Sequence, residues 1–281
     1  MSYQSLLVLL DRSPACTPRS ILAVQLAEKF GAFVSAYAPT GMTDLPATTV
    51  DVLTAAAYNG DEWDVFYSNA STAIDDFAKY CDDARFERFD TEVGRWPYIE
   101  NLLHRVNCSD LVMLTQARPD TLSDRALRKL TEELLLHSAR PVLLLPYTTT
   151  DTPKFERVML AWKNTRESAR AAADALPFLQ RAKKVYVVSW REHGDSTPTQ
   201  ERADMDLALG RWLQRHGVTA ELYAEPETSG ITEAMLSRAA DLQVGLIVMG
   251  AYGHSRIRER VLGGATRGIL DSMTVPVLMS H

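Results

Sequence analysis

The sequence predicts an α/β protein made of two tandem, doubly wound parallel-sheet domains. Three observations predict this fold: the chain repeats itself once, each copy alternates short apolar runs with helical patterns, and the composition is that of a packed protein. Strands that alternate with helices form a parallel sheet with helices on both faces, because each right-handed crossover packs a helix back onto the sheet.

The internal repeat becomes visible when the chain is compared with itself at two offsets, 152 and 135 residues, and neither comparison needs a gap. The two offsets differ by 17, so the first copy carries 17 additional residues, which we place between about Ala38 and Arg85. The first offset brings the apolar run 6–10 onto 158–162, and the second brings 111–114 onto 246–249 and 141–144 onto 276–279.

The join between the copies is polar, short and followed by Pro153, which is typical of a linker. We therefore expect a first domain at 1–147, a linker at 148–156 and a second domain at 157–281.

Short apolar runs bounded by polar turns predict buried strands, and apolar residues three or four apart predict helices. Leu22, Leu26 and Phe30 give such a helical face, which the second copy repeats near 171–179. Strands are expected at 6–10, 33–37, 111–114 and 141–145, and again at 158–162, 185–190, 246–249 and 276–279; further helices are expected at 204–216 and 265–272.

Composition excludes several classes of protein. Thirty basic and 36 acidic side chains give a formal charge of −6, which argues against a non-specific binder of nucleic acid or anionic membranes. No apolar run approaches the roughly 18 residues of a membrane span, and the first residues have no basic leader, so we expect a cytoplasmic protein. Three cysteines without short spacing predict neither a disulfide framework nor a Cys-rich zinc site.

A glycine-rich segment after the run 246–249 is the most informative site. In doubly wound sheets, ligands bind beyond the carboxyl ends of the strands. Gly250 and Gly253 follow the run, and Gly263 and Gly264 precede the expected helix. Glycines let backbone N–H groups approach a phosphate, and a helix N-terminus attracts anions. The alternative is an ordinary turn whose glycines only make room.

Polar side chains around these glycines could add contacts. Ser255 and Thr266 offer hydroxyl groups, and His254 could meet a phosphate or titrate near neutral pH, although a solvent-facing histidine is the alternative. Trp162 and Trp190 end two neighbouring expected strands, where they could stack on a base or simply pack in the core.

The glycine spacing, the Pro276-Val277-Leu278 ending and the start Val8–Ser13 together resemble the universal stress protein family. The resemblance covers nearly all of both copies and implies tandem five-stranded, adenine nucleotide alpha hydrolase-like domains. It implies that members of the family bind ATP in some cases and not in others, with the glycine loop at the phosphates and an aspartate after the first strand near the adenine or ribose. It also implies pairing through the last strands, here an intramolecular pseudo-dimer, with a homodimer as a further possibility.

The two copies depart from the family pattern in different ways. In the second copy Gly264 stands where serine or threonine is expected, and Lys163 replaces the aspartate, with Asn164 beside it as a substitute acceptor. The first copy keeps Asp11, but Thr115, Arg118, Arg128 and Lys129 replace the four glycines. We therefore expect a nucleotide only in the second copy, at the residues Ala161, Lys163, Val188, Gly250, Gly253, His254, Ser255, Gly263, Gly264 and Thr266.

These observations favour a cytoplasmic stress-response protein, sensing or regulatory in role, that binds ATP, with Mg²⁺ as a possible companion and no metal ligands of the protein identified. One alternative is a nucleotide-free interaction protein whose clefts bind a protein or a small apolar ligand, and the apolar insertion around 47–53 could serve such a partner. A slow ATP hydrolase is the weakest alternative, because no base or nucleophile can be assigned.

Overall fold

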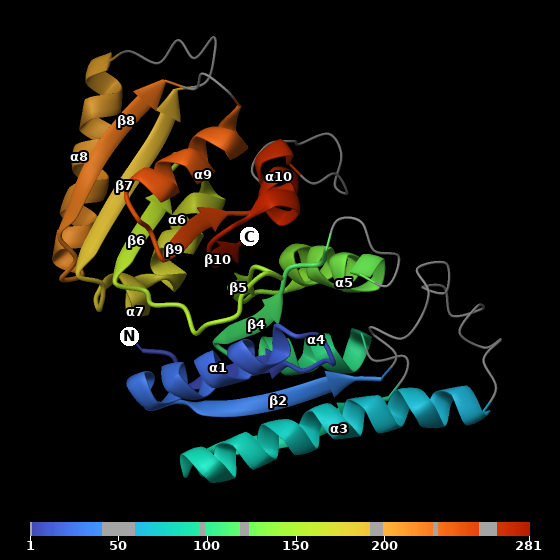
Figure 1. Ribbon diagram of the computed structural model, residues 1–281. Helices are drawn as coiled ribbons and strands as arrows, with labels where there is room; N and C mark the ends of the chain where they lie inside the picture. Colours follow the sequence, from blue (N-terminus) through green and yellow to red (C-terminus); the bar gives the residue numbers. More distant parts are fainter. Residues whose placement is uncertain are drawn as a thin grey trace. The chain divides into compact units, whose positions relative to one another are not determined.

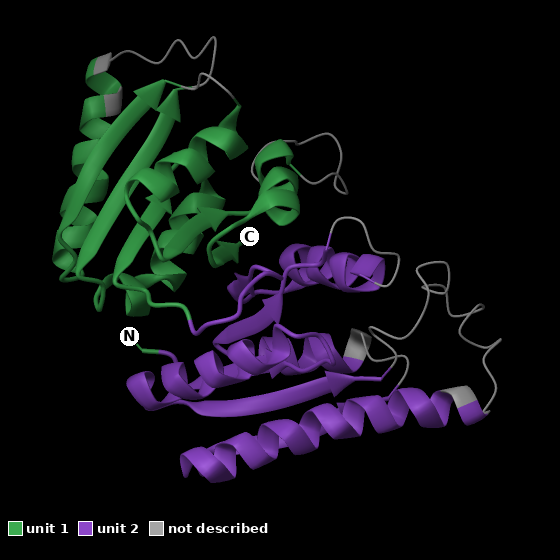
Figure 2. Cartoon of the chain, in the orientation of Figure 1, with its two compact units in different colours: residues 1–2, 153–281 green, residues 3–152 purple. Residues whose placement is uncertain are grey.

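The computed structural model describes residues 2–40, 60–95, 99–118, 124–191, 199–226, 230–252 and 263–281. The chain divides into two compact units, Tyr3–Thr152 and Pro153–His281, the latter together with the first two residues (Figure 2). The division falls at Thr152–Pro153, while the predicted linker bounds 148–156 and the pseudo-dimer stay predictions.

The first unit contains one parallel sheet with the strand order β3-β2-β1-β4-β5. Figure 1 labels β2, β4 and β5 of this sheet. The order reverses at β1, which lies between β2 and β4. Its elements are β1 (Ser5–Leu9), α1 (Cys16–Phe30), β2 (Phe33–Pro39), α3 (Gly60–Ala84), β3 (Phe89–Gly94), α4 (Ile99–Asn107), β4 (Leu111–Thr115), α5 (Asp124–His137) and β5 (Val142–Leu145).

The second unit repeats this arrangement with the strand order β10-β9-β6-β7-β8, again all parallel. Its elements are β6 (Arg157–Ala161), α6 (Arg166–Asp174), α7 (Leu176–Leu179), β7 (Lys184–Arg191), α8 (Thr199–Arg215), β8 (Ala220–Pro226), α9 (Ile231–Asp241), β9 (Leu246–Gly250), α10 (Gly264–Ser272) and β10 (Val277–Ser280). The predicted fold class, two doubly wound α/β domains, is confirmed.

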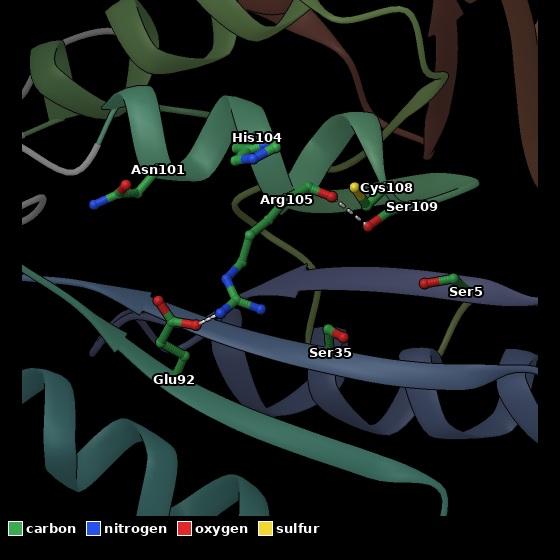
Figure 3. Close-up of a pocket in the computed structure, with 8 residues that line it drawn as sticks. All are labelled: Ser5, Ser35, Glu92, Asn101, His104, Arg105, Cys108 and Ser109. Atoms are coloured by element: carbon green, nitrogen blue, oxygen red, sulfur yellow. Dashed lines mark hydrogen bonds and ion pairs between the residues drawn. The ribbon is translucent and has the colours of Figure 1, made fainter.

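The central strands are buried because helices cover both faces of each sheet. In the first unit α1 and α3 pack on β1, β2 and β3, while α4 lies over the opposite face (Figure 3). Leu6 pairs in register with Val34 and Leu111 and is fully buried. Burial on both faces explains why these strands read as continuous apolar runs rather than as an alternating pattern.

Two helices differ from the sequence prediction for identifiable reasons, and a third, α3, bears on the predicted insertion. Helix α8 begins at Thr199, five residues before the expected start, because polar helix formers leave no apolar periodicity to detect. The helix expected near 171–179 is divided into α6 and α7 at Ala175, since Pro177 is tolerated only in a first turn. Helix α3 has 25 residues where α8 has 17, which accounts for part of the predicted insertion; residues 47–53 lie outside the described residues.

Within the described part of the chain, no helix is both long enough and apolar enough for a bilayer span.

Candidate ligand-binding site

A cavity of about 330 Å³ lies in the second unit at the carboxyl ends of β6, β7 and β9. The strand order of this unit reverses between β6 and β9, which is where doubly wound sheets bind ligands. The cavity is lined by Ala161, Trp162, Lys163, Thr165, Glu167, Ser168, Trp190, Ile231, Met235, Met249, Gly250, Gly263, Gly264, Ala265 and Thr266.

The start of α10 lines this cavity, and none of the described side chains caps it. Gly263 is the N-cap and makes no side-chain capping bond, and the first turn of α10 contains no acidic residue. A Cβ placed on Gly264 would meet no described atom within 4 Å, so none of the described residues crowds this position. The first amides of a helix have no partner within the helix and carry the positive end of its dipole. This end of the cavity is therefore suited to an anion.

Gly250 has a packing reason to be glycine. A Cβ at this position would lie 2.7 Å from the carbonyl carbon of Glu167 and 2.7 Å from the amide nitrogen of Ser168. The first turn of α6 thus rests directly on the end of β9, backbone against backbone. This contact holds with or without a ligand, so the predicted phosphate contact of Gly250 stays a prediction.

Thr266 links the start of α10 to Tyr252, two residues beyond β9. Its side chain is almost fully buried, and its Oγ1 accepts a hydrogen bond of 3.2 Å from the backbone N–H of Tyr252. The bond ties the end of β9 to the first turn of α10. The predicted contacts Gly253, His254 and Ser255 lie outside the described residues.

The turn from β6 into α6 positions Lys163 at the cavity. Thr165 is the N-cap of α6, and its side chain accepts a hydrogen bond from the backbone N–H of Ser168. The Ser168 hydroxyl in turn accepts from the backbone N–H of Lys163, at 3.4 Å. Asn164, the predicted substitute acceptor, instead donates to Sδ of Met205 and does not line the cavity.

Glu167 brings a carboxylate into the cavity that the sequence reasoning did not anticipate. Its side chain is 9% exposed and accepts a hydrogen bond of 2.5 Å from Nε of Arg166. Burial alone would raise the pKa of Glu167. The hydrogen bond from Arg166 and further hydrogen bonds at the start of α6 outweigh burial, so the pKa lies below its ordinary value. Glu167 is therefore ionised at neutral pH, and it is hydrogen-bonded to Arg166, whose own side chain is 82% exposed.

The two tryptophans and helix α9 supply the apolar part of the lining. Trp162 and Trp190 are each half-buried and line the cavity, so part of each side chain lies outside the core. Ile231 and Met235 of α9 also reach it, and only the apolar face of that helix could have indicated them. Of the two backbone positions predicted near the base, Ala161 lines the cavity, whereas Val188 does not and its carbonyl accepts from the N–H of Trp162.

The equivalent place in the first unit is filled by a buried arginine. Arg19 is fully buried, its Nη2 lies 2.8 Å from Oδ2 of Asp11, and its Nη1 donates to Oγ1 of Thr115. Thr115 occupies the position that Gly250 has in the second unit. The prediction that side chains fill this place is therefore supported, but through a different residue from those expected.

The substitutions predicted to fill the first unit lie elsewhere. Arg128 is paired with Glu132 along α5, Lys129 is exposed on the same helix, and the backbone N–H of Arg118 donates to Asp124. Arg19 was missed because an arginine in a helix usually reads as surface. Its spacing of three residues from Leu22, however, places it on the apolar face of α1, and Asp11 is its available partner.

A second cavity, of about 390 Å³, lies in the first unit between α4 and the sheet (Figure 3). Arg105 of α4 reaches across it to pair with Glu92 of β3. Ser5 and Ser109 place the cavity toward the amino ends of β1 and β4. Ligands of doubly wound sheets bind at the opposite edge, so the cavity of the second unit is the stronger candidate.

Among the described residues, no group of three His, Cys, Asp or Glu side chains is arranged to hold a metal ion.

Comparison with known proteins connects this fold to one group. No protein-family model matches the chain. A curated universal stress protein of Synechocystis sp. is 44% identical over 46 residues, which span 16% of this chain and 16% of that protein. The structure of a universal stress protein from Archaeoglobus fulgidus superposes with a TM-score of 0.73 at 17% identity, covering 98% of this chain and 95% of that one.

A structure from Pseudomonas aeruginosa, named as a candidate universal stress protein, gives a TM-score of 0.64 at 16% identity and covers 99% of this chain and 93% of that one. At sequence identities this low, the superpositions show that the chain shares the fold of these proteins. Each superposition covers both units of the chain. The family resemblance predicted from the sequence is thereby confirmed.

The packing at Gly250 predicts a difference between two glycines of the same cavity. Gly250→Ala forces a methyl group against the backbone of α6 and is expected to lower the free energy of unfolding by about 1–3 kcal/mol. Gly264→Ala places the methyl group in open space at a helix start and is expected to leave stability unchanged or raise it by up to about 1 kcal/mol. Urea unfolding of both variants measures this; equal losses would contradict the packing role of Gly250.

The Asp11–Arg19 pair predicts a pH-dependent contribution to stability. Burial raises the pKa of Asp11, but Arg19 and the hydrogen bonds from Ser13 outweigh it, so the pKa lies below its ordinary value of 3.8. Asp11→Asn leaves a buried guanidinium unpaired and is expected to cost about 3 kcal/mol near pH 7. The pKa of Asp11 is lower in the folded state than in the unfolded state. The ion pair therefore contributes its full stability above the unfolded-state pKa, and this contribution is lost as the pH falls through the folded-state pKa.

The difference between wild type and Asp11→Asn should therefore be constant above about pH 5 and shrink below about pH 4. The matched control is Asp75→Asn, at an exposed position of α3, which should show neither effect. Urea unfolding from pH 3 to pH 8 provides the measurement. A difference that stays constant down to pH 3 would show that the Asp11 charge does not stabilise the unit.

Proposed function

The chain is a tandem protein with the fold of the universal stress proteins, and on that basis we propose that it is a cytoplasmic stress-response protein whose second unit binds an adenine nucleotide. The observation that carries the proposal is the uncapped start of α10 facing an open cavity of nucleotide size. Its role would be sensing or regulation.

The parts of a nucleotide have separate partners in this cavity. The phosphates would meet the first-turn amides of α10, at Gly263, Gly264 and Thr266, where the dipole favours negative charge. The base would lie against Trp162 and Trp190, since aromatic stacking on a nucleobase is worth roughly 1–3 kcal/mol. A Mg²⁺ ion would be held mainly by the phosphates, because Glu167 is the one carboxylate among the described lining residues.

The cavity is better suited to holding a nucleotide than to hydrolysing it. A general base works best when its pKa lies near the working pH. Glu167 has a lowered pKa and is hydrogen-bonded to Arg166, so it is a weak proton acceptor. We therefore propose no catalytic role beyond, at most, slow ATP hydrolysis.

The apolar lining favours a second candidate function. Met235, Met249 and Ile231 join the two tryptophans around the cavity, and such a surface also suits a small apolar ligand. In this case the chain would be an interaction protein without a nucleotide, and a protein partner could dock on either unit. We also propose, on the family resemblance alone, that the two units pair within the chain as a pseudo-dimer, with a homodimer of two chains as a further possibility.

Titration calorimetry of the whole chain with ATP and Mg²⁺ tests the nucleotide proposal. Gly264→Glu puts a carboxylate at the start of α10 and should weaken ATP binding at least tenfold, because the added charge repels the phosphates and competes for the same amides. Gly264→Ala is the matched control, since it adds the first side-chain carbon without the charge, and should bind ATP within about threefold of wild type.

ATP binding that survives Gly264→Glu unchanged would place the nucleotide elsewhere. No ATP binding by the wild type, together with an apolar compound found in native mass spectra of the purified chain, would favour the second candidate function.

A further inference from the structure

The cavity of the first unit has two distinct walls. Helix α4 forms one wall, and β2 and β3 form the other, where Ser35 and Glu92 face the cavity (Figure 3). Its volume of about 390 Å³ lies within the range of roughly 300–1,000 Å³ that is typical of small-molecule sites. It lies in a different unit from the cavity assigned to the nucleotide, so it is a separate candidate site.

The strand registers show which residues of the second unit correspond to this cavity. With β1 and β6 aligned at the offset of 152 residues, the registers with β2 and β7 make Ser35 equivalent to Tyr186. The registers with β3 and β8 make Glu92 equivalent to Tyr223. The rings of Tyr186 and Tyr223 lie 6.3 Å apart, and the guanidinium carbon of Arg238 lies 4.7 Å from the Tyr223 ring centre. Aromatic side chains thus occupy in the second unit the space that stays open in the first.

A third position shows the same difference. Ser5 lines the cavity, and the offset of 152 residues makes it equivalent to Arg157. Arg157 extends to the connection between α9 and β9, where its Nη1 donates to the carbonyl of Leu242 and to Oε1 of Gln243. In the first unit the corresponding connection contributes Ser109 to the cavity wall. Three larger side chains in the second unit therefore stand where two serines and a glutamate line the cavity of the first.

One ion pair crosses the cavity from wall to wall. Arg105 of α4 pairs with Glu92 of β3, and their side chains are 43% and 37% exposed. An ion pair this exposed contributes little to stability because water screens it, so a ligand can separate it at small cost. The hydroxyls of Ser5 and Ser35, on the same walls, make no hydrogen bond to the described residues.

Opposite charges on opposite walls determine the charge of the ligand that fits. A carboxylate alone would be repelled by Glu92, and an amine alone would be repelled by Arg105. A molecule with both groups pairs with both residues: the guanidinium binds a carboxylate through two parallel hydrogen bonds, and an ammonium group donates to a carboxylate and to hydroxyl oxygens. Because Arg105 and Glu92 touch each other, the two charges of the ligand must also lie close together, as they do in an α-amino acid.

We propose that the first unit binds a free α-amino acid, as its zwitterion, in the cavity between α4 and the sheet. The carboxylate of the ligand pairs with Arg105, its ammonium group pairs with Glu92, and the hydroxyls of Ser5 and Ser35 supply further hydrogen bonds. This site goes beyond the nucleotide proposal and does not depend on it.

Thermal unfolding of the whole chain with each of the twenty protein amino acids tests the proposal, followed by calorimetry of those that raise the melting temperature. At least one amino acid is expected to bind. Its decarboxylated amine and its α-hydroxy acid analogue should each bind at least tenfold more weakly, because each lacks one of the two charges.

Three variants locate the site. Arg105→Gln and Glu92→Gln should each weaken binding at least tenfold, because each removes one partner of the zwitterion. Ser35→Tyr should abolish binding, since it introduces the residue that stands at the equivalent place in the second unit, and its circular dichroism should match that of the wild type. Glu156→Gln is the matched control: it removes a carboxylate from an exposed pair with Lys183 and should bind like the wild type.

Each contrary result overturns the proposal at a different point. If none of the twenty amino acids binds, the site itself is wrong. Binding that is unchanged in Arg105→Gln and in Ser35→Tyr would place the amino acid elsewhere. Equal affinity for the amino acid and for its amine or α-hydroxy acid would show that the ion pair does not recognise a zwitterion. None of these results bears on ATP binding by the second unit.

Discussion

The contact between the first turn of α6 and the end of β9 decides the form of the candidate site. Gly250 brings two backbones so close that a single methyl group would not fit between them. Because α6 is held there, its N-cap Thr165 and Ser168 fix the turn that carries Lys163, and the cavity opens between this turn and α10. In the first unit Thr115 stands at the equivalent position, and its hydroxyl accepts from Arg19 instead.

The two units carry side chains of opposite charge at equivalent positions. The first unit keeps an acid, Asp11, and neutralises it internally with Arg19, which removes both groups from water and fills the space. The second unit replaces the acid with Lys163 and has Ala171 where α1 has Arg19, so the space stays open. A buried charge must be paired to be tolerated. The first unit therefore contains the counter-ion of its own acid.

The fold was predictable because its strongest signals are local and repeated. Continuous apolar runs such as 246–249 mark strands buried on both faces, and the offset between copies predicted one unit from the other. Within the candidate site the structure gives a physical reason for glycine at Gly250, where the α6 backbone leaves no room for a Cβ, and not at Gly264, whose Cβ would meet no described atom within 4 Å. Glu167 escaped prediction because its burial comes from its contact with β9, which spacing along α6 does not reveal. Arg19 and Met235 lie on the apolar faces of α1 and α9, but that spacing does not reveal what either residue contacts.

Asymmetry between the units also suits a sensing role better than two equivalent sites would. A ligand that binds only the native state stabilises it by mass action, by about 2.7 kcal/mol at a concentration one hundred times its Kd. In the first unit the Asp11–Arg19 ion pair contributes its stability without a ligand, so under the proposed function ligand binding would add stability to the second unit. Under that proposal, one half of the chain would provide a constant structure, and the other would respond to ligand concentration. A signal of this kind needs no catalytic group, in agreement with a cavity whose carboxylate is ionised and already paired.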